Sequence, residues 1–236
     1  MAHTIAFGAA KGGVGKSTCT CAVAAVLARS SMRRMLVLDA AEQRNSLRYL
    51  QECRERGYLG NVDCDTATAS SLKRLASIEE GRLFSLIDLP GASRARELKV
   101  LLRGDSDVPG CDLLVVPMAP SDFDLEAVLD FVDEIVKPSG VPYGVVLSRV
   151  HPRSVNEASE LQHQLQQDGV NVFDTLVRDY RGVRDAQRQR VPLTEHRGPH
   201  DTVRFAEDDF CSLTREILRR VGSRVYIPPR VDDAAE

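Results

Sequence analysis

Several features that would assign a sequence to a simple class are missing from this chain. Its six cysteines contain no C-x-x-C pair, which argues against a zinc ribbon or redox motif. They are typical of small buried side chains in a reducing cytoplasm. There is no charged-then-apolar leader and no uninterrupted apolar span long enough to cross a bilayer. We therefore expect a soluble, cytoplasmic protein that does not contact a membrane.

An excess of charge of one sign is also lacking. The net charge is -3 and the calculated pI is near 6.0, so contact with nucleic acid would need a local basic patch. With 236 residues, 43% of them hydrophobic, the chain is long enough for one large α/β domain. We expect that domain over residues 1–225 and a loose tail over 226–236, which holds Pro228, Pro229 and several acids.

A glycine-rich loop close to the N-terminus organises the chain. It runs from Ala10 to Thr18 with the sequence AKGGVGKST, between an apolar strand-like run and an alanine-rich helix-like run. Its glycines permit close approach to phosphate oxygens, and the following helix directs backbone N–H groups at the same point. Lys16 is predicted to reach the β- and γ-phosphates and Ser17 to bind Mg²⁺. The alternative, a tight turn before an ordinary helix, explains the Gly-Lys-Ser ending poorly.

Two further apolar runs each end in a carboxylate, Asp39 and Asp88. Because ligands of parallel α/β sheets lie at the carboxyl ends of the strands, both side chains should face the phosphate site. Asp88 resembles a Walker-B residue that holds Mg²⁺ through water, and 89–92 would form a switch with Gly91 near the γ-phosphate. An aspartate after a strand can instead be a cap or turn residue.

The periodicity predicts a doubly wound, mostly parallel sheet flanked by helices in a single domain. The strands are expected at 4–7, 35–39, 61–65, 83–88, 113–117, 144–148 and 171–176. The helices are expected at 17–29, 47–56, 68–80, from 121 onward, 154–167 and 205–221. Ser121 and Asp124 resemble a capping box.

The loop resembles the deviant Walker-A ATPases of the ParA/MinD family, whose hallmark is K-G-G-x-G-K-[S/T]-[S/T]. Ala10 stands where the ordinary motif has glycine, and Lys11 adds a second lysine. The resemblance implies ATP or ADP with Mg²⁺, and a homodimer in which Lys11 touches the nucleotide of the partner subunit. It implies metal placement by Ser17, Asp39 and Asp88, and adenine contact by Arg149. The nucleotide-binding residues would be Lys11, Gly12, Gly13, Val14, Gly15, Lys16, Ser17, Thr18 and Arg149.

The first switch departs from the family pattern D-x-D-P-Q. Asp39 and Gln43 match, but Ala41 replaces the second aspartate and Glu42 the proline. The resemblance implies that the missing aspartate positions the attacking water. A methyl group accepts no hydrogen bond, so we expect ATP binding with strongly reduced turnover. Either an engineered alanine or natural divergence explains Ala41. In the natural case, Glu42 is a candidate for the missing carboxylate.

Arginines are concentrated in the C-terminal half. The stretch 178–190 contains five arginines against two aspartates, a local net charge of +3. Such a segment is usually a solvated helix face. Relatives, however, bind nonspecific DNA through basic residues of this half once ATP has paired two subunits. We therefore expect the DNA contacts among Arg178, Arg181, Arg184, Arg188, Arg215, Arg219 and Arg220.

The resemblance implies a short, single-domain partition ATPase. Such a protein dimerises with ATP, binds nucleoid DNA, and segregates or positions DNA or another cargo with a ParB-like, centromere-bound partner. Lys11, Lys16, Asp39, Asp88 and the altered position Ala41 would form the catalytic set. One alternative is a MinD-like membrane-cycling regulator, which the acidic, proline-containing tail disfavours. Another is a metabolic ATP-dependent enzyme of the same superfamily.

Overall fold

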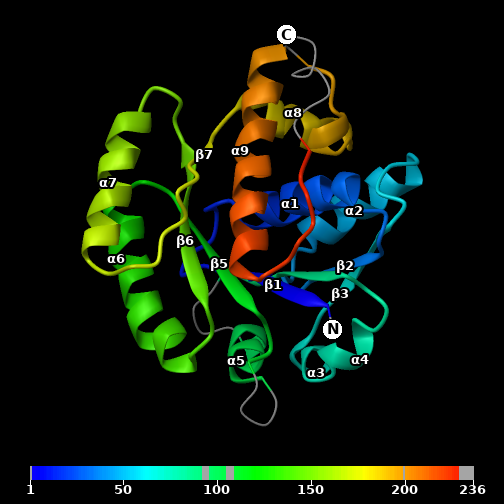
Figure 1. Cartoon of the computed structure of the whole chain (residues 1–236), viewed down its shortest axis with the longest axis horizontal. Coiled ribbons are helices and arrows are strands. Elements are labelled where there is room, and N and C mark those ends of the chain that lie inside the picture. Colours follow the sequence, from blue (N-terminus) through cyan, green and yellow to red (C-terminus); the bar gives the residue numbers. More distant parts are fainter. Residues whose placement is uncertain (1, 92–95, 105–108, 199, 229–236) are drawn as a thin grey trace.

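The computed structural model of the chain describes residues 2–91, 96–104, 109–198 and 200–228 (Figure 1). Its centre is a seven-stranded sheet in the order β3-β2-β4-β1-β5-β6-β7, in which every strand pair is parallel. The predicted fold class is confirmed. The strands are β1 (His3–Phe7), β2 (Met35–Asp39), β3 (Val62–Thr66), β4 (Phe84–Asp88), β5 (Leu113–Met118), β6 (Tyr143–Val150) and β7 (Val177–Arg178).

Helices connect the strands and cover both faces of the sheet. They are α1 (Lys16–Ser30), α2 (Asn45–Glu55), α3 (Ala69–Leu72), α4 (Leu75–Ile78), α5 (Arg96–Arg103), α6 (Asp122–Phe131), α7 (Val155–Gln167), α8 (Arg181–Gln189) and α9 (His200–Arg220). A π-helical turn, η1 (Val132–Val136), continues α6, and η2 (Lys137–Ser139) and η3 (Leu193–Glu195) are 3-10 turns.

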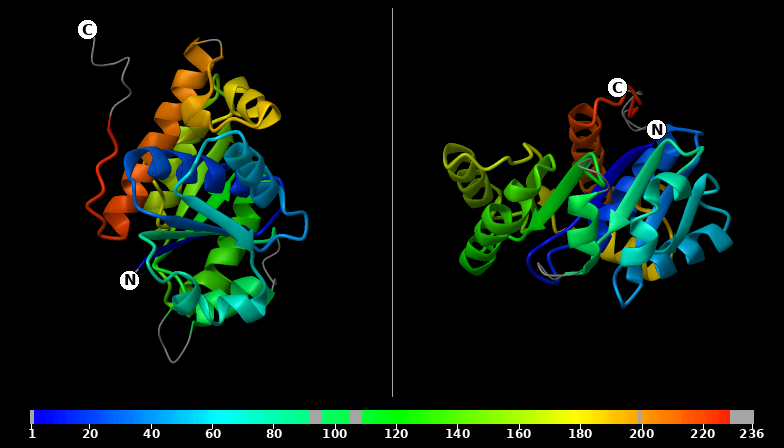
Figure 2. Two further views of the ribbon diagram at one scale, coloured as in Figure 1. Left: turned by 90° about the vertical axis from the view of Figure 1, so that its right-hand side faces the viewer. Right: turned by 90° about the horizontal axis from the view of Figure 1, so that it is seen from below.

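The alternation of side chains along each strand builds two cores. Ile5 and Phe7 of β1 pack with α1, α2, α8 and α9, whereas Ala6 faces the opposite core beside α5, α6 and α7. Strands β2, β4 and β5 are buried along their whole length, as apolar strands covered on both faces should be. Figure 2 shows the sheet between α1 on one side and α3 and α5 on the other.

Two predicted elements are wrong. The helix expected over 68–80 begins with a Thr68–Ser71 capping box but is divided into α3 and α4, because Arg74 between them leaves helical geometry (φ -113°, ψ 24°). The strand expected over 171–176 is reduced to one bridge at Val172, and β7 begins later. The backbone N–H groups of Asp174 and Thr175 donate to the Glu216 carboxylate of α9, 2.8 Å away in each case, rather than to β6.

Further differences concern helix ends and the tail. Helix α5 has no predicted counterpart, and α9 begins five residues before the expected start at 205. Half of the predicted capping box is present: the Ser121 hydroxyl accepts the Asp124 N–H at 3.3 Å, but the Ser121 N–H donates to the Ala119 carbonyl and not to Asp124. In the predicted tail, Ile227 is buried against the core, and 229–236 lie outside the described residues.

The strand register brings the candidate carboxylates together. Asp88 pairs with Asp39 on β2 and with Phe7 on β1. The glycine-rich loop follows β1, so it and both carboxylates lie at the same edge of the sheet.

Candidate nucleotide-binding site

The glycine-rich loop joins β1 to α1 in a conformation that its glycines permit. Gly13 and Gly15 have φ values of +82° and +94°, which side chains oppose. Gly15 is the N-cap residue of α1, and no side chain caps this end of the helix. The first N–H groups of α1 are therefore available to an anion, which the helix dipole also stabilises.

The loop forms one wall of a cleft of about 920 Å³. The first switch, the second switch, the carboxyl end of β6 and one face of α8 contribute further walls. Among the predicted residues, Ala41, Arg149, Arg178 and Arg184 line this cleft together with Gly12, Gly13, Gly15, Lys16, Ser17 and Thr18. Val14 is buried instead.

Lys16 lies at the centre of the loop and is 7% exposed. Its ammonium donates a hydrogen bond to the Lys11 carbonyl at 3.2 Å. Burial lowers the pKa of Lys16, and Asp88 opposes that shift. A Cβ on Gly91 would lie 2.9 Å from Lys16 Nζ and 3.0 Å from the Gly12 Cα. The second switch thus passes directly over the loop, and Ala92 at its end lies outside the described residues.

Asp88 is 1% exposed, and neither carboxylate oxygen has a hydrogen-bond partner among the described residues. Burial raises the pKa of Asp88 to about 6; the hydroxyls of Ser17 and Ser46, near it but outside hydrogen-bonding geometry, and Lys16 oppose this shift, and the charge of Asp39 adds to it. A buried carboxylate without a donor is poorly stabilised by the protein alone. Together with the Ser17 hydroxyl it offers the hard oxygen ligands that Mg²⁺ prefers, so these residues fit that ion.

Asp39 is equally buried, but the chain's own donors occupy its carboxylate. Oδ1 accepts the Ala41 N–H at 2.9 Å, and Oδ2 accepts the Ser46 hydroxyl at 2.6 Å and the Leu47 N–H at 3.0 Å. Asp39 therefore fixes the first switch and the start of α2. Its contact with a metal stays a prediction.

The first switch presents no carboxylate at position 41. The neighbouring Glu42 lines the cleft from an exposed position, and Glu97 of α5 lines it from a half-buried one. Glu97 was missed because the sequence pattern did not indicate α5. The cleft therefore contains carboxylates other than the aspartate that the family pattern requires.

Lys11 points away from the loop, toward α6 of the same chain. Its ammonium donates to the Phe123 carbonyl at 2.6 Å and lies 3.8 Å from Asp124 Oδ1. The Lys11 side chain is 45% exposed, and the Phe123 side chain beside it is an exposed aromatic group. In the single chain, Lys11 thus has an acceptor outside the phosphate site.

The carboxyl ends of β6 and β7 also line the cleft, and Arg149, expected in a loop after the strand, lies within β6. The Arg149 guanidinium donates to the Gly13 carbonyl at 2.7 Å, and the Ser148 hydroxyl donates to the Val14 carbonyl at 2.6 Å. Gln187 of α8 donates to the Thr18 hydroxyl at 3.1 Å. The sequence reasoning missed the lining residues Ser148, Val177, Asp179, Val183, Gln187 and Phe210, because their spacing carries no recognisable motif.

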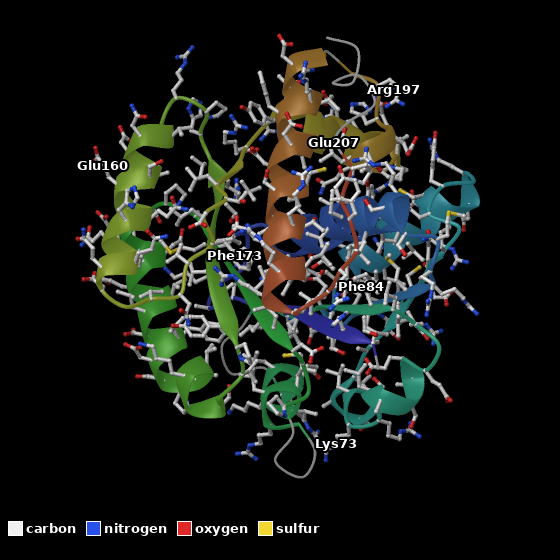
Figure 3. All side chains as sticks on the ribbon, viewed as in Figure 1. Lys73, Phe84, Glu160, Phe173, Arg197 and Glu207 are labelled. Carbon is white, nitrogen blue, oxygen red and sulfur yellow. The ribbon has the colours of Figure 1, made fainter. Side chains whose placement is uncertain are left out.

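The structure separates the predicted DNA-contacting arginines into two groups. Arg178 forms an ion pair with Asp209 at 2.5 Å, and its guanidinium lies 5.0 Å from the Tyr180 ring centroid. Arg220 donates to the Val172 carbonyl at 2.6 Å and covers the ring of Phe173, which Figure 3 labels between β6 and α9. These two guanidinium groups therefore stabilise the fold itself.

The other predicted arginines lie at the surface, where part of Arg220 is exposed as well. The side chains of Arg181 and Arg188 are 77% and 78% exposed, although each lies near Asp185, and Arg184 pairs with Asp179 at 2.7 Å. Arg215 and Arg219 are exposed on α9. The exposed arginines among the predicted DNA contacts are thus divided between α8 and α9.

A glycine-rich loop between a buried strand and a helix, at the carboxyl edge of a parallel sheet, defines a P-loop nucleotide-binding protein. The family model of the CobQ/CobB/MinD/ParA nucleotide binding domain matches residues 5–193. The chain belongs to this family, which confirms the resemblance to ParA/MinD proteins.

Similar proteins include one curated relative and solved structures of the same fold. "Maintenance of carboxysome distribution protein A" of Gloeobacter kilaueensis is 32% identical over 211 residues, which is 89% of this chain and 91% of the relative. MinD in the MinC:MinD cell division complex of Aquifex aeolicus has a TM-score of 0.73 at 16% identity, with 97% and 99% of the two chains covered. The septum site-determining protein MinD of Pyrococcus horikoshii, complexed with Mg-ADP, has a TM-score of 0.68 at 18% identity, with 92% and 96% covered.

A magnesium nucleotide thus occurs in a solved protein of this fold. Within the part of the chain that the structure describes, no helix has the length and apolar character needed to cross a membrane.

Proposed function

We propose that this protein is a ParA-type positioning ATPase that forms a homodimer around ATP and Mg²⁺. In the ATP state it binds nonspecific DNA of the nucleoid and moves or positions a cargo together with a ParB-like partner. The observation that carries the proposal is the phosphate loop with Lys16 and Ser17 beside the unpartnered Asp88 carboxylate, and a second lysine, Lys11, at its rim.

The proposed roles follow from the contacts of each side chain. Lys16 and the N–H groups of α1 bind the phosphates, and Ser17 and Asp88 hold Mg²⁺, which neutralises charge on the β- and γ-phosphates when bound. Asp39 supports the first switch, and its metal contact belongs to this proposal. Lys11 exchanges its contact with α6 for the nucleotide of the partner subunit.

Reduced turnover is part of the proposal. Ala41 lies in the cleft wall, where its methyl group neither orients water nor neutralises metal charge. Removing a preorganised catalytic hydrogen-bond partner commonly costs about 10²–10³ in rate. The ATP-bound dimer is therefore long-lived.

The cargo need not be DNA. The curated relative is named for carboxysome distribution, which supports positioning of a large assembly as well as segregation of DNA. In both cases the DNA contacts include exposed arginines of the C-terminal half, and pairing two subunits doubles the number of phosphate contacts.

The test combines mass and DNA binding. Light scattering gives the mass with ATP and Mg²⁺, with ADP, and without nucleotide, and retardation of DNA of arbitrary sequence is measured on the same samples. We expect a stable dimer that shifts DNA with ATP alone. A monomer that ignores DNA in the presence of ATP would contradict the proposal and favour a metabolic ATP-dependent enzyme.

A further inference from the structure

A second cavity, of about 310 Å³, lies between α1, α2 and α8. Two arginines line it, Arg48 of α2 and Arg190 at the end of α8, with the polar side chains of Thr18, Tyr49 and Gln187 around them. Neither motif analysis nor the nucleotide cleft accounts for this arginine pocket. Tyr49 and Gln187 already donate to the Val191 carbonyl and the Thr18 hydroxyl, so the two guanidinium groups are the donors that the pocket offers to an anion.

The two guanidinium groups differ in how they are neutralised. Arg190 Nε donates to Glu52 Oε2 at 2.8 Å. Arg48 is exposed and forms no ion pair with any residue that the structure describes. Of the two guanidinium groups, the one on Arg190 is thus neutralised by a carboxylate, whereas the charge of Arg48 is not.

The surface around the pocket continues the positive charge. The Arg188 side chain of α8 is 78% exposed, and the Asp185 carboxylate that pairs with it is as far as 3.9 Å away. Arg56, just beyond α2, donates to the Gln189 carbonyl at 2.8 Å and so ties the two helices together. In Figure 1, α2 and α8 lie on the same side of the molecule, flanking α1. In a chain of net charge -3, this is a local basic surface.

We propose that the arginine pocket binds a backbone phosphate of duplex DNA. Arg48 and Arg190 contact the phosphate, and Arg188 lies at the rim of the pocket. Guanidinium groups bind phosphate through paired N–H donors without reading base sequence. An open pocket larger than one phosphate accommodates a phosphodiester with its sugar. This inference rests on the proposed function, and it places the DNA surface on α2 and α8 rather than on α9.

The arginine pocket is also coupled to the nucleotide cleft. Ser17, Thr18, Asn45 and Gln187 line both cavities, and the Gln187–Thr18 hydrogen bond crosses the shared wall. The Ser46 hydroxyl, in the wall of the arginine pocket, donates to Asp39 below the first switch. A ligand in one cavity therefore contacts the elements that bind the other, and the change in affinity is reciprocal.

The test compares single arginine substitutions that change the charge equally. Arg48→Gln and Arg190→Gln probe the pocket, and Arg215→Gln and Arg219→Gln on α9 are the matched controls. Anisotropy of a labelled duplex of arbitrary sequence is measured with ATP and Mg²⁺ over a range of salt concentrations. Arg48→Gln is the cleaner pocket variant because it breaks no ion pair of the fold.

We expect each pocket variant to weaken DNA binding roughly tenfold, with little change for the α9 variants. The slope of log affinity against log salt should fall by about 1 per lost phosphate contact, hence about 2 in a dimer. DNA should also change the affinity for ATP less in Arg48→Gln than in the wild-type protein. Thermal unfolding of each variant confirms that the fold is retained.

Three outcomes would overturn the inference in distinguishable ways. If Arg215→Gln and Arg219→Gln weaken binding and the pocket variants do not, the DNA surface lies on α9. If all four variants weaken binding equally, only net charge matters. If the wild-type protein binds ATP and binds no duplex, the proposed function fails together with the pocket, and an acidic protein becomes the alternative partner.

Discussion

Replacing Asp88 by asparagine should stabilise the protein without nucleotide while removing its response to magnesium. The Asp88 carboxyl is 1% exposed and has no hydrogen-bond partner among the described residues. Burial raises its pKa from 3.8 to about 6. The folded state therefore binds more protons than the unfolded chain between these two values, and stability falls as pH rises through this range.

The magnitude follows from the same two values. The difference between 3.8 and about 6 corresponds to roughly 3 kcal/mol lost above about pH 6. Asparagine is neutral throughout, so Asp88→Asn escapes this loss. The difference in free energy of unfolding between Asp88→Asn and the wild-type protein should therefore grow as the pH rises. From about pH 4 to neutral pH it should increase by up to roughly 3 kcal/mol in favour of the variant.

Urea unfolding with a chelator at several pH values measures this difference, with Asp168→Asn, at an exposed aspartate, as the control. ATP should then stabilise both proteins by mass action, and adding Mg²⁺ to the ATP should stabilise the wild-type protein further but leave Asp88→Asn unchanged. A stability difference that is constant with pH, or that shrinks as pH rises, would refute the reasoning from burial. A variant that still responds to Mg²⁺ would refute the metal assignment.

The remaining predictions address turnover, pairing and folding. Ala41→Asp should raise phosphate release from ATP about tenfold or more and shorten the dimer lifetime; an unchanged rate would show that another carboxylate already acts. Lys11→Ala should keep ATP binding, measured by calorimetry, and lose the dimer in light scattering, whereas a stable dimer would contradict the trans contact. Glu216→Ala should lower the free energy of unfolding by about 1–3 kcal/mol per unpaired donor, because the Asp174 and Thr175 N–H groups lose their acceptor; denaturant titration measures it, and a neutral effect would show that water replaces the carboxylate.

The parts of the fold that could be predicted are those encoded within a few neighbouring residues. The glycine-rich loop and the strands ending in Asp39 and Asp88 lie where their patterns indicated, because loop chemistry and strand burial are local properties. The register of β2 with β4 then brings the two carboxylates together.

The parts that could not be predicted depend on contacts between distant segments. Glu216 draws residues 174–175 away from the sheet, and Asp209 neutralises Arg178 from α9. The sequence shows the charge of Arg178 but not its partner. Arg48 was overlooked for the same reason, since it becomes notable only when α2 packs beside α8.

The contact between Lys11 and the start of α6 has a consequence for the reversibility of the proposed dimer. Because the Lys11 ammonium already has an oxygen acceptor 2.6 Å away in the single chain, pairing exchanges one hydrogen bond for another. Only the difference between the two contributes to dimer affinity. Once the terminal phosphate is gone, the lysine has an intramolecular acceptor to return to, so the subunits separate without leaving a charge unsolvated.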